Sequence, residues 1–125
     1  MTKNQLFKAL NQLCNEMHIS YNINCGGCCY VAAVLAENLE NINIPFKVIH
    51  YDLYSCHYAI KVSDRYLNRS DYRKKEITDI YDWKSKDIYS IYYNNSWNEM
   101  YNKKWNLIVS TRIKALFKKY ENSRT

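Results

Sequence analysis

The only two glycines of this 125-residue chain are adjacent, and a run of residues with helical character follows them directly. Gly26 and Gly27 lie in the segment NCGGCC at residues 24–29. A thiol in the first turn of a helix lies near unpaired N–H groups and the positive end of the helix dipole, which stabilise a thiolate. The sequence therefore predicts that Cys28 is placed like a nucleophile.

One helix is expected before this segment and another after it. Thr2 with Gln5 three residues later is a capping-box pattern, which predicts the start of an amphipathic helix. The apolar residues of this first helix recur at helical spacing: Leu6, Leu10, Leu13, Cys14 and Met17. The second helix begins near Cys28, ends before Pro45 and has an apolar stripe made of Val31, Ala32, Leu35, Ala36 and Leu39. Because only this second helix is rich in alanine, we expect it at the centre of the core.

An antiparallel meander is expected after the second helix. Residues 46–52 and 57–62 have the β-branched and aromatic content of strands, and Ser63-Asp64 is suited to a tight turn into residues 65–69. Residues 72–106 follow no clear pattern, and a last helix is marked by Ile113, Leu116, Phe117 and Tyr120. The prediction is an α+β fold with one domain, residues 1–125.

Composition limits the classes to which the chain can belong. A chain of this length, 47% apolar, can build one modest core. It has no run of 18 apolar residues, and its N-terminus MTKNQ lacks the apolar segment of a signal peptide. Five cysteines, an odd number, argue against a disulfide scaffold, so we expect reduced thiols in a soluble cytoplasmic protein. The net charge of +6 is dispersed, and we expect neither nucleic acid nor a membrane as partner.

The order of chemically reactive residues suggests a catalytic set. A thiolate nucleophile needs an imidazole to hold its proton, and the imidazole needs a polar group that fixes its tautomer. Cys28 opens a helix, His57 begins a strand, and Asn68 or Asp71 follows on or after the next strand. In a hairpin that turns at residues 63–64, position 68 lies near the partners of His57, so a carboxamide there can reach the ring.

Three segments carry a resemblance to a known superfamily: NCGGCCYVA at residues 24–32, HYAIKV at 57–62 and DRYLN at 64–68. In these segments the chain resembles the papain-like cysteine hydrolases, including transglutaminase-like and NlpC/P60-like proteins, and above all small bacterial and phage members. The resemblance covers about residues 20–72. It implies Cys28 as nucleophile, His57 as general base and acid, and Asn68 as the group that orients His57, with Asp71 as the competing third member. It also implies a papain-like fold, in which the helix of Cys28 packs on a small antiparallel sheet.

The expected reaction is that of a thiol peptidase, amidase or acyltransferase. Attack of the Cys28 thiolate on an acyl carbon gives a thioester, which water or an amine resolves. Backbone N–H groups near Cys29 are the expected oxyanion donors, assisted by the side chain of Asn24. No cofactor is required. The expected partner is a peptide or amide substrate, such as a bacterial or host protein, in the cytoplasm of a bacterium or a phage-infected cell.

Three alternatives use the same residues. A non-enzymatic bacterial or phage binding protein can keep this fold with a degenerate site. A zinc site can be formed by Cys25, Cys28, Cys56 and His57, although adjacent strand residues such as Cys56 and His57 point to opposite faces. A thioredoxin-type pair of Cys25 and Cys28 lacks the buried strand that precedes such a motif. The remaining thiols and imidazoles are expected to be structural: Cys14, Cys29, Cys56, His18 and His50.

Overall fold

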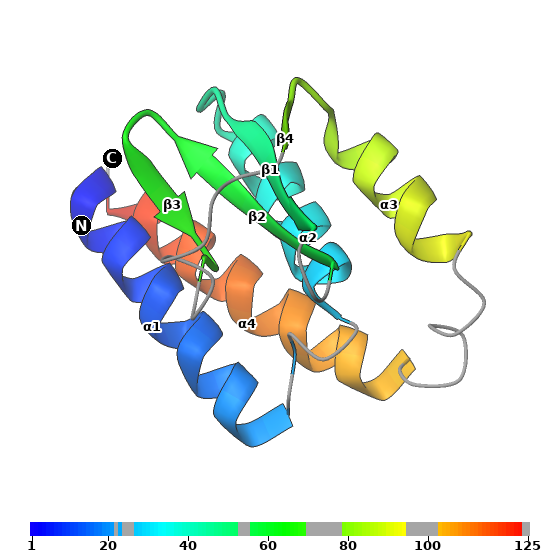
Figure 1. The fold of residues 1–125 in the computed structure, drawn as a ribbon. Coiled ribbons are helices and arrows are strands. Elements are labelled where there is room, and N and C mark those ends of the chain that lie inside the picture. The colour runs from blue at the N-terminus through cyan, green and yellow to red at the C-terminus, as the bar shows by residue number, and fades with distance from the viewer. Residues whose placement is uncertain (22, 24–26, 53–55, 70–78, 95–102, 124–125) are drawn as a thin grey trace.

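The computed structural model describes residues 1–21, 23, 27–52, 56–69, 79–94 and 103–123 (Figure 1). The described elements are α1 (Lys3–Tyr21), α2 (Cys28–Asn41), β1 (Lys47–Asp52), β2 (Cys56–Val62), β3 (Arg65–Leu67), β4 (Asp79–Tyr81), α3 (Ser85–Tyr93) and α4 (Lys103–Asn122). They form one four-stranded antiparallel sheet accompanied by helices. The predicted α+β class is confirmed.

Both N-terminal helices begin where the sequence predicts. The Thr2 N–H donates to Gln5 Oε1 at 2.8 Å, and the Gln5 N–H donates to Thr2 Oγ1 at 3.1 Å, so the capping box is formed. Helix α2 begins at Cys28 and is buried along most of its length, from Cys28 to Ala36 without interruption. The predicted central position of α2 is therefore confirmed.

The predicted hairpins are also confirmed, with boundaries shifted by one residue at the start of β1 and of β2, and with β3 ending at Leu67, two residues earlier than predicted. Strand β1 pairs with β2 from Lys47 opposite Lys61 to Asp52 opposite Cys56. Strand β2 turns into β3 through Ser63, whose φ of 51° is the left-handed conformation that a tight turn requires.

The structure assigns two elements in the segment that showed no clear pattern. Strand β4 pairs with the free edge of β1, which gives the strand order β3-β2-β1-β4, and helix α3 follows. Strand β4 has three residues, which are too few to show the alternation of apolar and polar side chains that predicts a strand. In α3 the buried residues are Ser85, Ile88 and Tyr92, and the adjacent Tyr89 and Tyr93 obscure the helical period.

The helices cover one face of the sheet (Figure 1). Helix α2 packs against β2, α3 and α4, while α1 packs on α4 and touches β3. The main core lies between these helices and the sheet. A second, small cluster of Ile49, Tyr51 and Ala59 lies on the opposite face of the sheet, with Tyr66 packed against it. The start of α1 and the end of α4 are adjacent, since the Met1 amine donates to Ser123 Oγ at 3.1 Å.

Candidate functional site

Cys28 is the first residue of α2 and is 5% exposed. The residue before it, Gly27, is the N-cap, and its carbonyl accepts the first helical hydrogen bond from the Val31 N–H at 3.1 Å. Glycine has no side chain that could cap the helix, so the N-cap residue offers no side-chain acceptor to the first N–H groups of α2. The helix terminus therefore offers Cys28 the electrostatic setting that favours a thiolate.

The neighbouring thiols have different surroundings. Cys29 Sγ lies 3.5 Å from the Ile88 carbonyl oxygen, to which a protonated thiol donates. Complete burial raises the pKa of Cys14 to about 12. Both side chains belong to the main core, in agreement with the prediction that they are structural.

His57 is completely buried near the start of β2. Its Nε2 atom lies 2.7 Å from the main-chain carbonyl oxygen of Asn68. A carbonyl oxygen only accepts hydrogen bonds, so we assign the proton of the neutral ring to Nε2. Nδ1 is then the basic nitrogen of the ring.

Asn68 meets His57 through its backbone carbonyl, whereas the sequence analysis assigned the contact to the side-chain carboxamide. Asn68 follows the end of β3 and has a φ of 59°, a left-handed conformation that asparagine tolerates better than most residues. Asn68 therefore contacts His57 through its main chain, and strand periodicity gives no sign of this local twist of the chain.

Asn11 in α1 is a site residue that the sequence analysis missed. Its Nδ2 donates to the Tyr66 carbonyl at 2.8 Å, and its Oδ1 accepts from the Asn68 N–H at 2.9 Å. One carboxamide therefore holds the backbone on both sides of Leu67. The sequence contains only a weak sign that Asn11 is important, which is its position at the edge of the apolar stripe, one helical turn from the core residues Phe7 and Cys14.

Burial lowers the pKa of His57 below its usual value of 6.5. The carbonyl of Asn68 opposes this shift, and the charges of His18 and His50 add to it. Burial is the largest of these causes, because moving an imidazolium out of water is unfavourable. His57 is therefore neutral at pH 7, in the protonation state of a general base.

This lowered pKa predicts acid sensitivity of the fold. The unfolded chain binds a proton at His57 near pH 6.5, whereas the folded chain does so only at lower pH, so stability is complete above that value and falls as the pH decreases. We expect the urea midpoint of the wild type to drop between about pH 7.5 and about pH 5.5, and to drop less in His57→Gln. His18→Gln is the matched control and should retain most of the wild-type dependence. Equal slopes for the wild type and His57→Gln would contradict the assignment.

The position of His57 in the strand limits how it can approach Cys28. Successive side chains of a strand alternate between faces, and Ile60 belongs to the main core whereas Ala59 belongs to the small cluster on the other face. His57 shares the face of Ala59, and its ring centroid lies 6.0 Å from that of Tyr51. Because α2 packs on the opposite face, a contact between His57 and Cys28 has to form around the start of β2.

A second imidazole lies on the helix-covered face. His50 Nδ1 lies 3.6 Å from Asp79 Oδ2, and its ring stacks on Tyr58 with centroids 4.6 Å apart. The pairing of β1 with both neighbouring strands produces this arrangement, since Tyr58 and Asp79 are the two register partners of His50. His50 therefore provides a matched control for any experiment on His57.

Aromatic residues cover the beginning of α2. Tyr30 contacts Tyr89 and Tyr92 of α3, with ring centroids 5.9 and 5.1 Å away, and Trp105 of α4 at 6.4 Å. A Cβ atom added at Gly27 would collide with the Trp105 ring. The Trp105 ring therefore fills the space that the missing side chain of Gly27 would otherwise leave open.

Several predicted site residues lie outside the described part of the chain. These are Asn24, Cys25 and Asp71, together with the side chain of Cys56. The zinc and redox alternatives depend on Cys25 and so stay predictions. Among the described residues, no three His, Cys, Asp or Glu side chains are grouped so that they could hold a metal ion.

None of the described helices combines the length and the apolar character that crossing a bilayer requires.

Compared with protein-family models, curated proteins and solved structures, the chain gave no match.

Proposed function

We propose that this chain is a papain-like thiol hydrolase or acyltransferase in which Cys28 is the nucleophile and His57 the general base. Nδ1 of His57 takes the thiol proton, and Sγ of Cys28 attacks the acyl carbon of an amide. The same nitrogen then returns the proton to the leaving amine, which leaves a thioester on Cys28. Water or a second amine resolves the thioester, with His57 again acting as the base.

The observation that carries this proposal is the hydrogen bond between His57 Nε2 and the Asn68 carbonyl, at 2.7 Å. A completely buried histidine whose tautomer is set by a main-chain acceptor presents one defined basic nitrogen. The lowered pKa keeps that nitrogen unprotonated at neutral pH. Asn68 thus has the role of the third member of the triad, exerted through its backbone.

The start of α2 suits the developing oxyanion. The first N–H groups of a helix have no carbonyl partner four residues earlier, and the dipole favours negative charge there. In this proposal the Cys29 N–H and the side chain of Asn24 bind the oxyanion.

Asn11 is the positioning residue of this proposal. Its two hydrogen bonds, to Tyr66 and Asn68, hold the backbone whose carbonyl meets His57. Replacing Asn11 with alanine removes both bonds and leaves a partly buried carbonyl and N–H to find other partners, which costs about 1–3 kcal/mol.

The test is acylation by p-nitrophenyl acetate, followed by intact-protein mass spectrometry and peptide mapping. We expect one acetyl group on Cys28, formed with a rate that rises with pH through a single ionisation, and at least tenfold slower formation in His57→Gln. His50→Gln is the control and should acylate at the wild-type rate. Loss of acylation in His50→Gln but not in His57→Gln would contradict the assignment of the base. Absence of any Cys28 adduct would favour the binding protein with a degenerate site.

The variant Asn11→Ala tests the positioning role separately. We expect slower acylation, together with nitrogen NMR shifts showing that His57 no longer populates the Nε2–H tautomer alone. Gln12→Ala, which removes an exposed carboxamide from the adjacent position of α1, should change neither. An unaltered tautomer in a folded Asn11→Ala protein would exclude the positioning role.

A further inference from the structure

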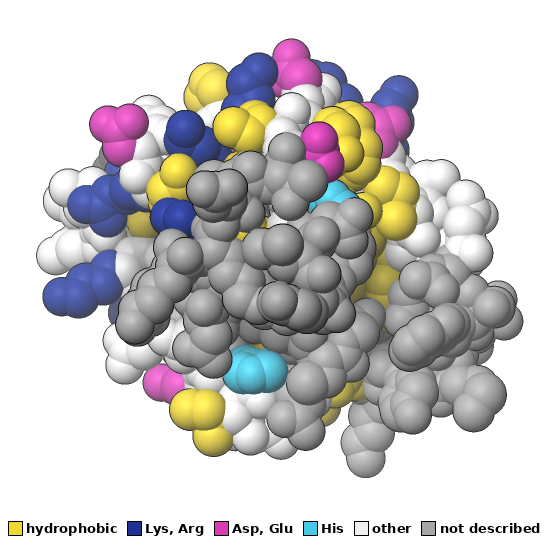
Figure 2. Space-filling view, viewed as in Figure 1, with side chains coloured by type: hydrophobic (Ala, Val, Ile, Leu, Met, Phe, Trp, Pro, Cys, Tyr) yellow, Lys and Arg dark blue, Asp and Glu magenta, His cyan; other side chains and the backbone are white. Residues whose placement is uncertain are grey.

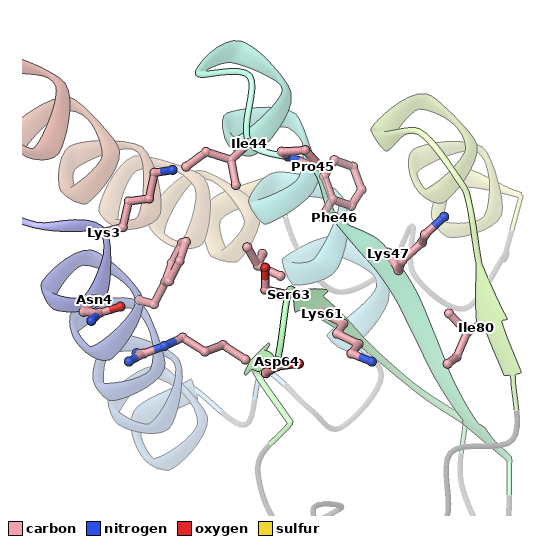
Figure 3. Close-up of a pocket in the computed structure, with 13 residues that line it drawn as sticks. Lys3, Asn4, Ile44, Pro45, Phe46, Lys47, Lys61, Ser63, Asp64 and Ile80 are labelled. Atoms are coloured by element: carbon pink, nitrogen blue, oxygen red, sulfur yellow. The ribbon is translucent and has the colours of Figure 1, made fainter.

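A pocket of about 770 Å³ lies at the end of the sheet where β2 turns into β3 (Figure 3). Its walls come from the first turns of α1, from the connection between α2 and β1, and from the turn between β2 and β3. Val62, which lines it, is five residues beyond His57 on β2, or about 17 Å along an extended strand. The pocket is therefore separate from the proposed catalytic site.

Positive charge dominates the rim of this pocket. Lys3, Lys47, Lys61 and Arg65 line it, against the single carboxylate of Asp64. Figure 2 shows Lys and Arg side chains gathered on the side of the molecule where α1 begins and the β2–β3 turn lies. Lys47 pairs with Asp82 at 3.1 Å, but within the described residues no ion pair involves the other three cations.

Two of these cations come from paired positions of adjacent strands. Lys47 and Lys61 are direct register partners in the antiparallel pair of β1 and β2, so their side chains leave the same face. Like charges at such positions destabilise a sheet. Asp82 already pairs with Lys47, so a bound carboxylate would offset the charge that remains on Lys61.

The floor of the pocket is apolar. Phe7, Ile44 and Val62 are buried beneath it, Phe46 is half-buried, and Ile80 is 54% exposed at its edge. Ile80 is one of the few large apolar side chains of the described residues that are exposed to this extent. An occupant therefore has to offer apolar side chains as well as negative charge.

We propose that this pocket binds an acidic peptide segment of a partner protein, one that carries apolar side chains among its carboxylates. The carboxylates contact Lys3, Lys61 and Arg65, and the apolar side chains cover Phe46 and Ile80. A single-stranded nucleic acid fits less well, because such ligands stack their bases on exposed rings, and the aromatic residues here are a buried Phe7 and a half-buried Phe46.

The test is fluorescence anisotropy with a labelled ten-residue peptide in which Glu alternates with Leu, at low ionic strength. We expect saturable binding to the full chain that weakens with added salt. The double variant Lys3→Glu/Lys61→Glu should raise Kd at least tenfold, and Ile80→Ser should raise it about threefold. Lys114→Glu, which reverses an exposed charge on α4 outside the pocket, is the control and should leave Kd within about twofold of the wild type.

Two further probes separate the alternatives. A peptide with Ser in place of Leu should bind more weakly, because it cannot cover the apolar floor. Equal affinity of the wild type and the double variant would overturn the proposal, as would no binding up to about 1 mM peptide. Tighter binding of a ten-nucleotide oligothymidine than of the peptide would overturn it in favour of a nucleic-acid partner. None of these outcomes depends on acylation of Cys28. This proposal can therefore fail while the proposed function stands, and the proposed function can fail while this proposal stands.

Discussion

Replacing Cys28 with serine should remove the fast phase of alkylation by iodoacetamide near neutral pH. The wild-type thiol lies at the first position of α2, where the helix terminus favours the anion that reacts. His57 adds no positive charge in its resting state, because burial lowers its pKa, so the helix terminus is the main cause. We expect Cys28 to react at least tenfold faster than Cys14 and Cys29, with an apparent pKa below the usual thiol value of about 8.5. Peptide mapping over time gives the rate of each thiol.

The matched control is Cys29→Ser. Its hydroxyl can donate to the Ile88 carbonyl as the Cys29 thiol does, so the fold is retained and the fast phase should persist. A fast phase that survives in Cys28→Ser and disappears in Cys29→Ser would assign the reactive thiol to the second cysteine. Similar rates for all thiols would remove the reason to regard Cys28 as a nucleophile.

Gly27→Ala should destabilise the protein by about 3 kcal/mol, the upper end of the usual range for overpacking. The added Cβ would lie 2.6 Å from the Ile23 carbonyl oxygen and 2.7 Å from Cζ2 of Trp105. Real Cβ atoms do not approach so closely, and one of the two obstacles is backbone. The backbone φ of −109° does not require glycine, so the whole effect comes from the contact. Urea unfolding followed by tryptophan fluorescence and circular dichroism measures the change.

A double-mutant cycle identifies the obstacle. Trp105→Leu alone loses the hydrogen bond from Nε1 to the Tyr21 carbonyl, at 3.1 Å, and part of the aromatic contact with Tyr30. In the Trp105→Leu background, Gly27→Ala should cost at least 1 kcal/mol less, because one of its two collisions is gone. Strict additivity of the two substitutions would show that the Trp105 ring does not occupy the space in front of Gly27.

Most of the elements that the sequence predicted have long, regular patterns, and the three-residue strand β3 was predicted from the turn before it. The Thr2–Gln5 capping box and the spacing of Leu6, Leu10 and Leu13 are sufficient for α1, and the alanine-rich run is sufficient for α2. Strand β4 and helix α3 were missed because one is three residues long and the other interrupts its apolar period with tyrosines. Short elements depend on their tertiary partners: β4 pairs with the edge of β1, and α3 packs on the surface of α2. The pattern of a single sequence carries no information about such partners.

The candidate site also has features that the sequence predicted and contacts that it did not predict. The sequence alone determined that a thiol opens a helix after a glycine and that Asn68 comes close after the strand that pairs with the strand of His57, because helix caps, tight turns and strand registers are local properties of the chain. Only the tertiary structure decided that Asn68 uses its carbonyl, that Asn11 of α1 holds that carbonyl in place, and that Trp105 closes the space before Gly27. The contacts of Asn11 and Trp105 join segments far apart in the sequence and depend on how the helices pack, while the use of the Asn68 carbonyl depends on the left-handed backbone of that residue; no local pattern encodes these features.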